Sequence, residues 1–230
     1  MARVGRREAL GTMSAAGAAI ALGCGGDAIT GPSSTGTSTG TVTSTNAACA
    51  VTPTETIGPF PSLIDLVRSD VREGKAGTTL RLTIVVVNAN SGCAPVSSAD
   101  VEIWQCDAVG HYSQYGTQAR ETYLRGIQTT DAGGQVSFTT IYPGWYQGRA
   151  THIHVEVTMS GRSVKATQMA FDEAVNRAVH ATGVYAARGA NPISNLADGV
   201  FSDSLSAELV TPAVDPTGGY AATFRVAVAL

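Results

Sequence analysis

Apolar and polar residues alternate along several short stretches of the chain. Between residues 79 and 88, every second residue is aliphatic and faces the same side: Leu80, Leu82, Ile84 and Val86. Alternation with a period of two predicts half-buried β-strands. On this pattern, together with β-branched content, we expect strands at Thr79–Asn88, Asp100–Cys106, Gln135–Ile141, His152–Met159, Val164–Ala170 and Tyr220–Val228.

Turn-forming sequences separate these stretches. They include Asn-Ser-Gly at 90–92, Asp-Ala-Gly-Gly at 131–134 and Ser-Gly-Arg at 160–162. One short helix is expected at Asp172–Ala181, and Ala187–Val200 is expected to be an ordered loop. Many strands with few helices indicate an all-β fold, a β-sandwich with short helices and ordered loops.

Composition is consistent with one globular domain and a tail. The 230 residues are 43% hydrophobic and 14% charged, with a net charge of −3. No basic stripe interleaved with aromatic residues is present, so nothing indicates a nucleic-acid partner. No apolar run is long enough to span a bilayer in the mature protein.

The first 24 residues have the features of a targeting segment. Arg6-Arg7 precedes a weakly apolar stretch, Ala9–Leu22, which resembles a twin-arginine export signal. Small residues followed by Cys24 resemble a bacterial lipoprotein cleavage site, although Ala21 stands where Leu is usual. We therefore expect an exported, extracytoplasmic protein, with Cys24 as a candidate lipid anchor. The alternative is an ordinary cleaved signal with an incidental cysteine.

Residues 25–48 are rich in Gly, Ser and Thr and predict a flexible tether, which leaves 49–230 as the folded domain. This domain contains Cys49, Cys93 and Cys106. In an oxidising compartment one pair is expected, with one thiol left free. Cys93 and Cys106 are expected near opposite ends of a hairpin, which argues against their pairing. The partners otherwise stay open.

Two histidines, His152 and His154, lie two positions apart on an expected strand. Residues at i and i+2 point to the same face, so both imidazoles can reach one ion. The alternative for such a pair is a polar, solvated strand face. The neighbourhood lacks a third His or a carboxylate at the spacing of a zinc hydrolase.

Tyrosines are abundant around this pair: Tyr112, Tyr115, Tyr123, Tyr142 and Tyr146. A phenolate is a hard anionic ligand, and a trivalent cation can hold it deprotonated at neutral pH although free Tyr titrates near ~10. Two phenolates with two imidazoles suit Fe(III) better than Zn(II). The alternative for any single tyrosine is packing with a satisfied hydroxyl.

Several ordered motifs between residues 52 and 171 are similar to those of one enzyme family, the intradiol ring-cleavage dioxygenases. They are Thr52-Pro53 with Thr56, Gly58 and Pro59; Val101-Glu-Ile-Trp-Gln, then Gly110-His-Tyr112; Tyr142-Pro-Gly-Trp-Tyr146; Arg149-Ala-Thr-His152-Ile-His154; and Thr167-Gln168-Met169. Asp65–Arg72 and Leu124-Arg-Gly-Ile-Gln resemble an extracytoplasmic subgroup of that family.

The resemblance implies a fold, a cofactor and a reaction. The fold is an immunoglobulin-like (prealbumin-like) β-sandwich, with 49–230 as a catalytic domain. One Fe(III) per chain would be held by four side chains: Tyr112, Tyr146, His152 and His154. Tyr146 would also act as a base, Arg149 would stabilise developing charge, and Gln168 would position the intermediate. The substrates would be a catechol and O2, giving a muconate-type diacid. The particular catechol and the oligomeric state stay open.

The sequence differs from the family pattern at some positions, and two other functions also stay open. Only residues 147–151 separate Tyr146 from His152, where larger members of the family have an insert, which predicts an open pocket. Phe60 stands where many relatives have Tyr. His111 and His180 are expected to be exposed and without a role. The main rival is a non-catalytic, transthyretin-like binding module of an exported lipoprotein, and the second is a zinc hydrolase that uses the His pair.

Overall fold

The computed structural model describes residues 49–230. The expected export signal (1–24), its Cys24 and the expected tether (25–48) lie outside the described residues and stay predictions. Within the described part, no helix is long and apolar enough to cross a membrane.

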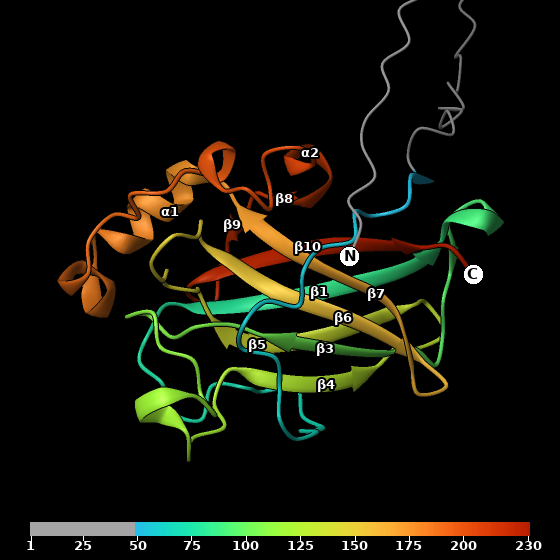
Figure 1. The fold of residues 1–230 in the computed structure, drawn as a ribbon, viewed down its shortest axis with the longest axis horizontal. Coiled ribbons are helices and arrows are strands. Elements are labelled where there is room, and N and C mark those ends of the chain that lie inside the picture. Colours follow the sequence, from blue (N-terminus) through green and yellow to red (C-terminus); the bar gives the residue numbers. More distant parts are fainter. Residues whose placement is uncertain (1–48) are drawn as a thin grey trace, which may run out of the picture. The chain divides into compact units, whose positions relative to one another are not determined.

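Two five-stranded sheets form the domain (Figure 1). The first contains β1 (Thr79–Asn88), β2 (Ala94–Pro95), β5 (Gln135–Ile141), β9 (Ala213–Val214) and β10 (Tyr220–Val228). The second has the order β4 (Arg125–Thr129), β3 (Asp100–Trp104), β6 (His152–Met159), β7 (Arg162–Phe171) and β8 (Leu209–Val210). The strands β1 and β10 lie side by side and parallel along their whole length, whereas β3, β6 and β7 pair antiparallel.

One hydrophobic cluster unites the two sheets. It takes alternate residues of β1 and β10 from the first sheet and alternate residues of β3 and β6 from the second; among them are Leu82, Phe224, Ile103 and Val155. The alternation in the sequence arises because each strand turns one face to this cluster. The predicted mostly-β fold with few helices is confirmed, and the immunoglobulin-like arrangement stays a prediction.

Helical segments are short and lie outside the sheets (Figure 1). The α-helices are α1 (Glu173–His180) and α2 (Leu205–Glu208), and the 3₁₀ turns are η2 (Ala89–Ser91), η3 (Gly116–Gln118), η4 (Gly183–Ala187) and η5 (Asn195–Ala197). The expected helix at 172–181 is confirmed to within one residue at each end. Asp172 caps it, because its side chain accepts hydrogen bonds from the backbone N–H groups of Ala174 and Val175.

The structure differs from the sequence interpretation in several features: the short strands β2, β8 and β9 were not expected, and β3 ends at Trp104 and not at Cys106. Strand β4 was not expected, because the buried residue that begins it is Arg125 rather than an apolar one. The expectation that His180 is exposed is wrong. Its side chain is 2% exposed, and its Nε2 lies 3.2 Å from the carbonyl oxygen of Pro143.

A disulfide joins Cys49 to Cys93 and leaves Cys106 as a buried free thiol. This confirms one pair among the three cysteines and excludes the Cys93–Cys106 pairing. The bridge ties the start of the described chain to the loop that follows η2.

Candidate metal centre

Three neighbouring strands place polar and aromatic side chains in one row. Trp104 of β3 is the register partner of His154 of β6, and His154 is in turn the partner of Gln168 of β7. Their sequence neighbours Ile103, Ile153 and Met169 belong to the core cluster. Because side chains alternate along a strand, the row lies on the opposite face of the sheet.

The two histidines of β6 converge as their spacing predicts. Their Nε2 atoms are 3.1 Å apart, and both rings are buried. The Nδ1 of His152 lies 2.6 Å from the carbonyl oxygen of Ala150, which places the proton on Nδ1 and leaves a lone pair on Nε2. His154 Nδ1 has no hydrogen-bond partner among the residues described.

Both predicted tyrosines reach the histidine pair from loops. Tyr112 follows the end of β3, is 4% exposed and has its hydroxyl 3.5 Å from His152 Nε2. Tyr146 precedes β6 and is half-buried, with its ring 5.5 Å from the rings of both Tyr112 and His152. Phe60 stacks on Tyr112 with a centroid distance of 4.7 Å.

Arg149 lies beside this cluster and is held by two polar side chains. Its Nη2 donates to Gln168 Oε1 (2.6 Å), and its Nε donates to Asp198 Oδ2 (2.8 Å). Its Nη1 is 3.4 Å from the hydroxyl of Tyr146. The amide nitrogen of Gln168 donates to the carbonyl oxygen of Thr56 (2.7 Å).

Burial governs the electrostatics of the four predicted ligands. It lowers the pKa of His152 to about 3, with a further contribution from the positive charge of Arg149. Burial also lowers the pKa of His154 well below its usual value, so both imidazoles are neutral at pH 7. It raises the pKa of Tyr112 far above the ordinary range, and that of Tyr146 as well. A phenolate here therefore requires a cation in contact with it.

This donor set fits a trivalent iron ion. Two neutral imidazole nitrogens face each other across 3.1 Å, and a phenol oxygen lies 3.5 Å from one of them. A cation held between these atoms would accept the imidazole lone pairs and stabilise the phenolates. By contrast, no group of three His, Cys, Asp or Glu side chains within 49–230 could hold a metal, as a zinc hydrolase would need.

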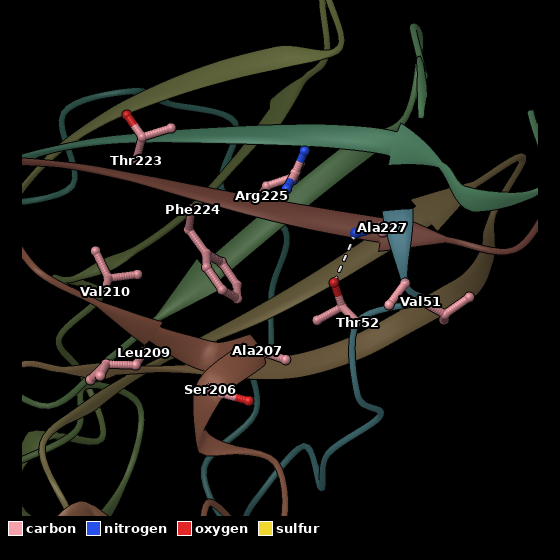
Figure 2. A pocket seen from close by; sticks show the side chains of 11 residues that line it. Val51, Thr52, Ser206, Ala207, Leu209, Val210, Thr223, Phe224, Arg225 and Ala227 are labelled. Carbon is pink, nitrogen blue, oxygen red and sulfur yellow. Dashed lines mark hydrogen bonds between the residues drawn. The ribbon is translucent and has the colours of Figure 1, made fainter. Parts of the chain in front are cut away.

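An aromatic cavity opens beside the predicted ligands. It has a volume of about 220 Å³, and its walls include Phe60, Tyr112, Tyr115 and Tyr146. A larger cavity of about 370 Å³ lies between β10, α2 and residues 50–52, where the hydroxyl oxygen of Thr52 accepts a hydrogen bond from Ala227 N (Figure 2). None of the predicted ligands lines that larger cavity, so we take the smaller, aromatic cavity as the candidate substrate site.

Two residues of this region received no role from the sequence. Asp198 lies 49 positions from Arg149 in the chain, so no local pattern could pair them. Trp104 is part of a motif quoted above, but its parallel stacking on His154 follows only from the strand register.

Comparison with known proteins gives one family. A family model described as "Dioxygenase" matches residues 60–191, a segment that contains the four predicted ligands together with Arg149 and Gln168. The catechol 1,2-dioxygenase of Candida albicans is 34% identical over 94 residues, which are 33% of this chain and 31% of that protein. The sequence match thus spans about a third of that relative.

Solved structures with similar folds cover far more of the domain. An intradiol ring-cleavage dioxygenase from Tetranychus urticae superposes with a TM-score of 0.70 at 28% identity, over 79% of this chain and 95% of the other. The dioxygenase domain of a carbohydrate-binding fusion protein from Streptomyces sp. SirexAA-E gives 0.61 at 26% identity, over 79% and 99%.

Proposed function

The chain belongs to the family of intradiol ring-cleavage dioxygenases, and from this premise we propose that it cleaves catechol-type diols between the two hydroxyl-bearing carbons. The reaction inserts both atoms of O2 and gives a muconate-type diacid. The electron count closes without a further reductant, because the four electrons that O2 takes up come from the ring carbons it joins.

We propose one Fe(III) per chain, held by Tyr112, Tyr146, His152 and His154. The observation that supports this proposal is that two buried imidazoles have their Nε2 atoms 3.1 Å apart, with the hydroxyl of Tyr112 3.5 Å from one of them and the ring of Tyr146 beside the same histidine. When bound, the ferric ion would draw electron density from a coordinated diol and so make a ring carbon reactive toward O2.

The side chains divide the remaining work. The half-buried Tyr146 sits in a loop; as the phenolate that a bound ferric ion would stabilise, it can take a proton from the incoming diol at its phenolate oxygen and so act as the base. Arg149 points Nη1 toward that same hydroxyl and can stabilise negative charge as it develops on the substrate oxygen. Gln168 accepts a hydrogen bond from Arg149 Nη2 and would help to position the intermediate. Phe60 and Tyr115 offer ring faces for the aromatic substrate.

The decisive test is the colour and the product. Purified protein loaded with iron should be red to burgundy, contain about one iron per chain, and convert catechol to cis,cis-muconate with uptake of one O2. The non-catalytic, transthyretin-like binding module would be colourless and leave catechol intact. Stoichiometric zinc with no iron after growth in iron-rich medium would refute the proposal.

Export is a separate proposal that rests on the first 24 residues. The Cys49–Cys93 disulfide supports it, because such bridges persist mainly in oxidising compartments. We propose an extracytoplasmic domain, 49–230, tethered through residues 25–48 to a lipid on Cys24. Replacing Cys24 by Ser should release a soluble exported form, and finding the unaltered protein in the cytosolic fraction would refute export.

A further inference from the structure

We propose that Asp198 is the residue that positions Arg149 for the reaction. This inference rests on the proposed function, since Arg149 matters there only if charge develops beside it. It assigns a role to a residue outside the segment 60–191 that the family model matches.

The contacts of Asp198 lead to this assignment. Its carboxylate is 1% exposed and forms an ion pair with Arg149, whose single Nε–H is shared between Oδ2 at 2.8 Å and Oδ1 at 3.1 Å. The same Oδ2 accepts the backbone N–H of Ala150 at 2.7 Å. One carboxylate therefore fixes the side chain of Arg149 and the backbone that follows it, just before β6 begins.

The contacts of Arg149 with Asp198 and Gln168 also determine which nitrogen of the guanidinium remains free to interact with the substrate. Asp198 occupies Nε and Gln168 occupies Nη2, so Nη1 is the nitrogen that faces Tyr146. An arginine side chain has several rotatable bonds, and two fixed contacts on its planar fork remove most of that freedom. Without Asp198, the guanidinium can rotate about its hydrogen bond to Gln168, and Nη1 then no longer faces the hydroxyl of Tyr146.

The loop that carries Asp198 is itself anchored. Oδ1 accepts the backbone N–H of Val200 at 2.9 Å, and the carbonyl oxygen of Asp198 accepts the backbone N–H of Phe201 at 3.1 Å. Through these bonds Asp198 also stabilises its own loop, independently of its contact with Arg149. The experiment must therefore separate the effect on Arg149 from a general loosening of the loop.

A double-mutant cycle makes that separation. Asp198→Asn, Arg149→Gln and the double variant are compared in the full-length, iron-loaded protein, with Asp203→Asn as control. Asp203 is exposed, lies five positions away, and loses the same charge. Iron content, visible spectrum, urea unfolding, anaerobic catechol binding and kcat are measured for each protein.

We expect Asp198→Asn to keep its iron, its visible band and a catechol Kd within about twofold of wild type, because it leaves the four ligands in place. Its kcat should fall by about 10- to 100-fold, since a misplacement near 1 Å can cost about 10²-fold. In the Arg149→Gln background the same substitution should change kcat by less than about twofold.

Three results would overturn the inference. An equal loss of kcat in both backgrounds would mean that Asp198 acts through the fold and not through Arg149. A kcat for Asp198→Asn equal to that of Asp203→Asn would remove the role while leaving the proposed function intact. Wild-type protein that neither binds iron nor cleaves catechol would refute the proposed function, and this inference with it.

Discussion

Trp104 stacks flat on His154, with ring centroids 4.8 Å apart and planes inclined by only 2°. On another side, the backbone at Gly58 approaches so closely that a Cβ there would lie 2.8 Å from His154 Cε1. His152 is oriented differently, by a hydrogen bond from Nδ1 to the carbonyl oxygen of Ala150. The two histidines thus keep their orientation by different means: His154 Nδ1 has no hydrogen-bond partner among the described residues, and its ring is held by packing against Trp104 and Gly58 and by its contact with His152.

This difference gives a first prediction. Trp104→Leu should weaken iron binding by about 10- to 100-fold, the usual cost of removing a group that orients a metal ligand. Trp104→Phe retains a flat ring and should stay within a few-fold of wild type. Iron affinity can be measured by competition with a chelator while the visible band is followed.

A matched control separates orientation from stability. Phe138 is a buried core residue in the other sheet, and Phe138→Leu also removes aromatic volume. It should lower the free energy of unfolding yet leave iron affinity unchanged. Equal iron affinities for Trp104→Leu and wild type would show that the stacking does not orient His154.

The two tyrosines should respond differently to loss of the hydroxyl. Tyr112 is almost fully buried, whereas Tyr146 is half-buried in a loop and can move when substrate arrives. Tyr112→Phe should mainly weaken iron binding. Tyr146→Phe should keep much of the iron, shift the visible band and slow catechol deprotonation. Anaerobic stopped-flow spectra distinguish these outcomes; wild-type binding rates and spectra in both variants would mean that neither tyrosine is a ligand.

Much of the framework was predictable because it depends on local pattern. The bounds of β1, β5, β6 and β10 agree with the expected strands, since alternation along a strand reflects one buried face. What could not be predicted depends on distant partners. Strand β4 begins with buried Arg125, whose guanidinium is satisfied by Ser113 and by the carbonyl oxygen of Phe60, 65 positions away.

The candidate site follows the same division. The spacing of His152 and His154 was sufficient to predict that both lie on one face, and their Nε2 atoms do converge. Tyr112 and Tyr146 were selected by resemblance, because loops carry no periodicity from which an approach to β6 could be inferred. The contact of Asp198 with Arg149 required the folded chain.

Glu208 gives a prediction about stability and pH. It is fully buried, and burial raises its pKa from 4.5 to about 7, with the negative charge of Glu55 adding to the effect; the bond from Ser204 opposes it. Between these two values the folded state holds a proton that the unfolded state has released. Stability should therefore fall as pH rises from about 5 to 7, and the loss should level off above that.

The variant Glu208→Gln tests this assignment. The variant cannot ionise at this position, so it should lack that part of the pH dependence. Between pH 5 and pH 8 the free energy of unfolding should fall by up to about 3 kcal/mol more in the wild type than in the variant. Urea unfolding at pH 5, 6, 7 and 8 measures the difference between the two proteins. Parallel curves for wild type and variant would contradict the raised pKa.

The aromatic cavity should prefer uncharged catechols. The side chains that line it include Phe60, Tyr115 and Gln118, and none is Lys or Arg. Arg125 lies 5.5 Å from the ring of Tyr115, but its guanidinium is buried and already bonded to protein oxygens. His111 also lines the cavity, but its side chain is more than half exposed. A carboxylate on the substrate would therefore lose water without gaining a buried cation, which costs binding. Catechol and 4-methylcatechol should therefore be cleaved with kcat/KM at least about tenfold higher than 3,4-dihydroxybenzoate, a difference of roughly 1.4 kcal/mol.

Gln118→Arg would place a cation at the cavity wall and should narrow that ratio, while the exposed Arg120→Gln should leave it unchanged. Comparable kcat/KM values for the acid and for catechol in the wild-type enzyme would show that charge does not select the substrate here.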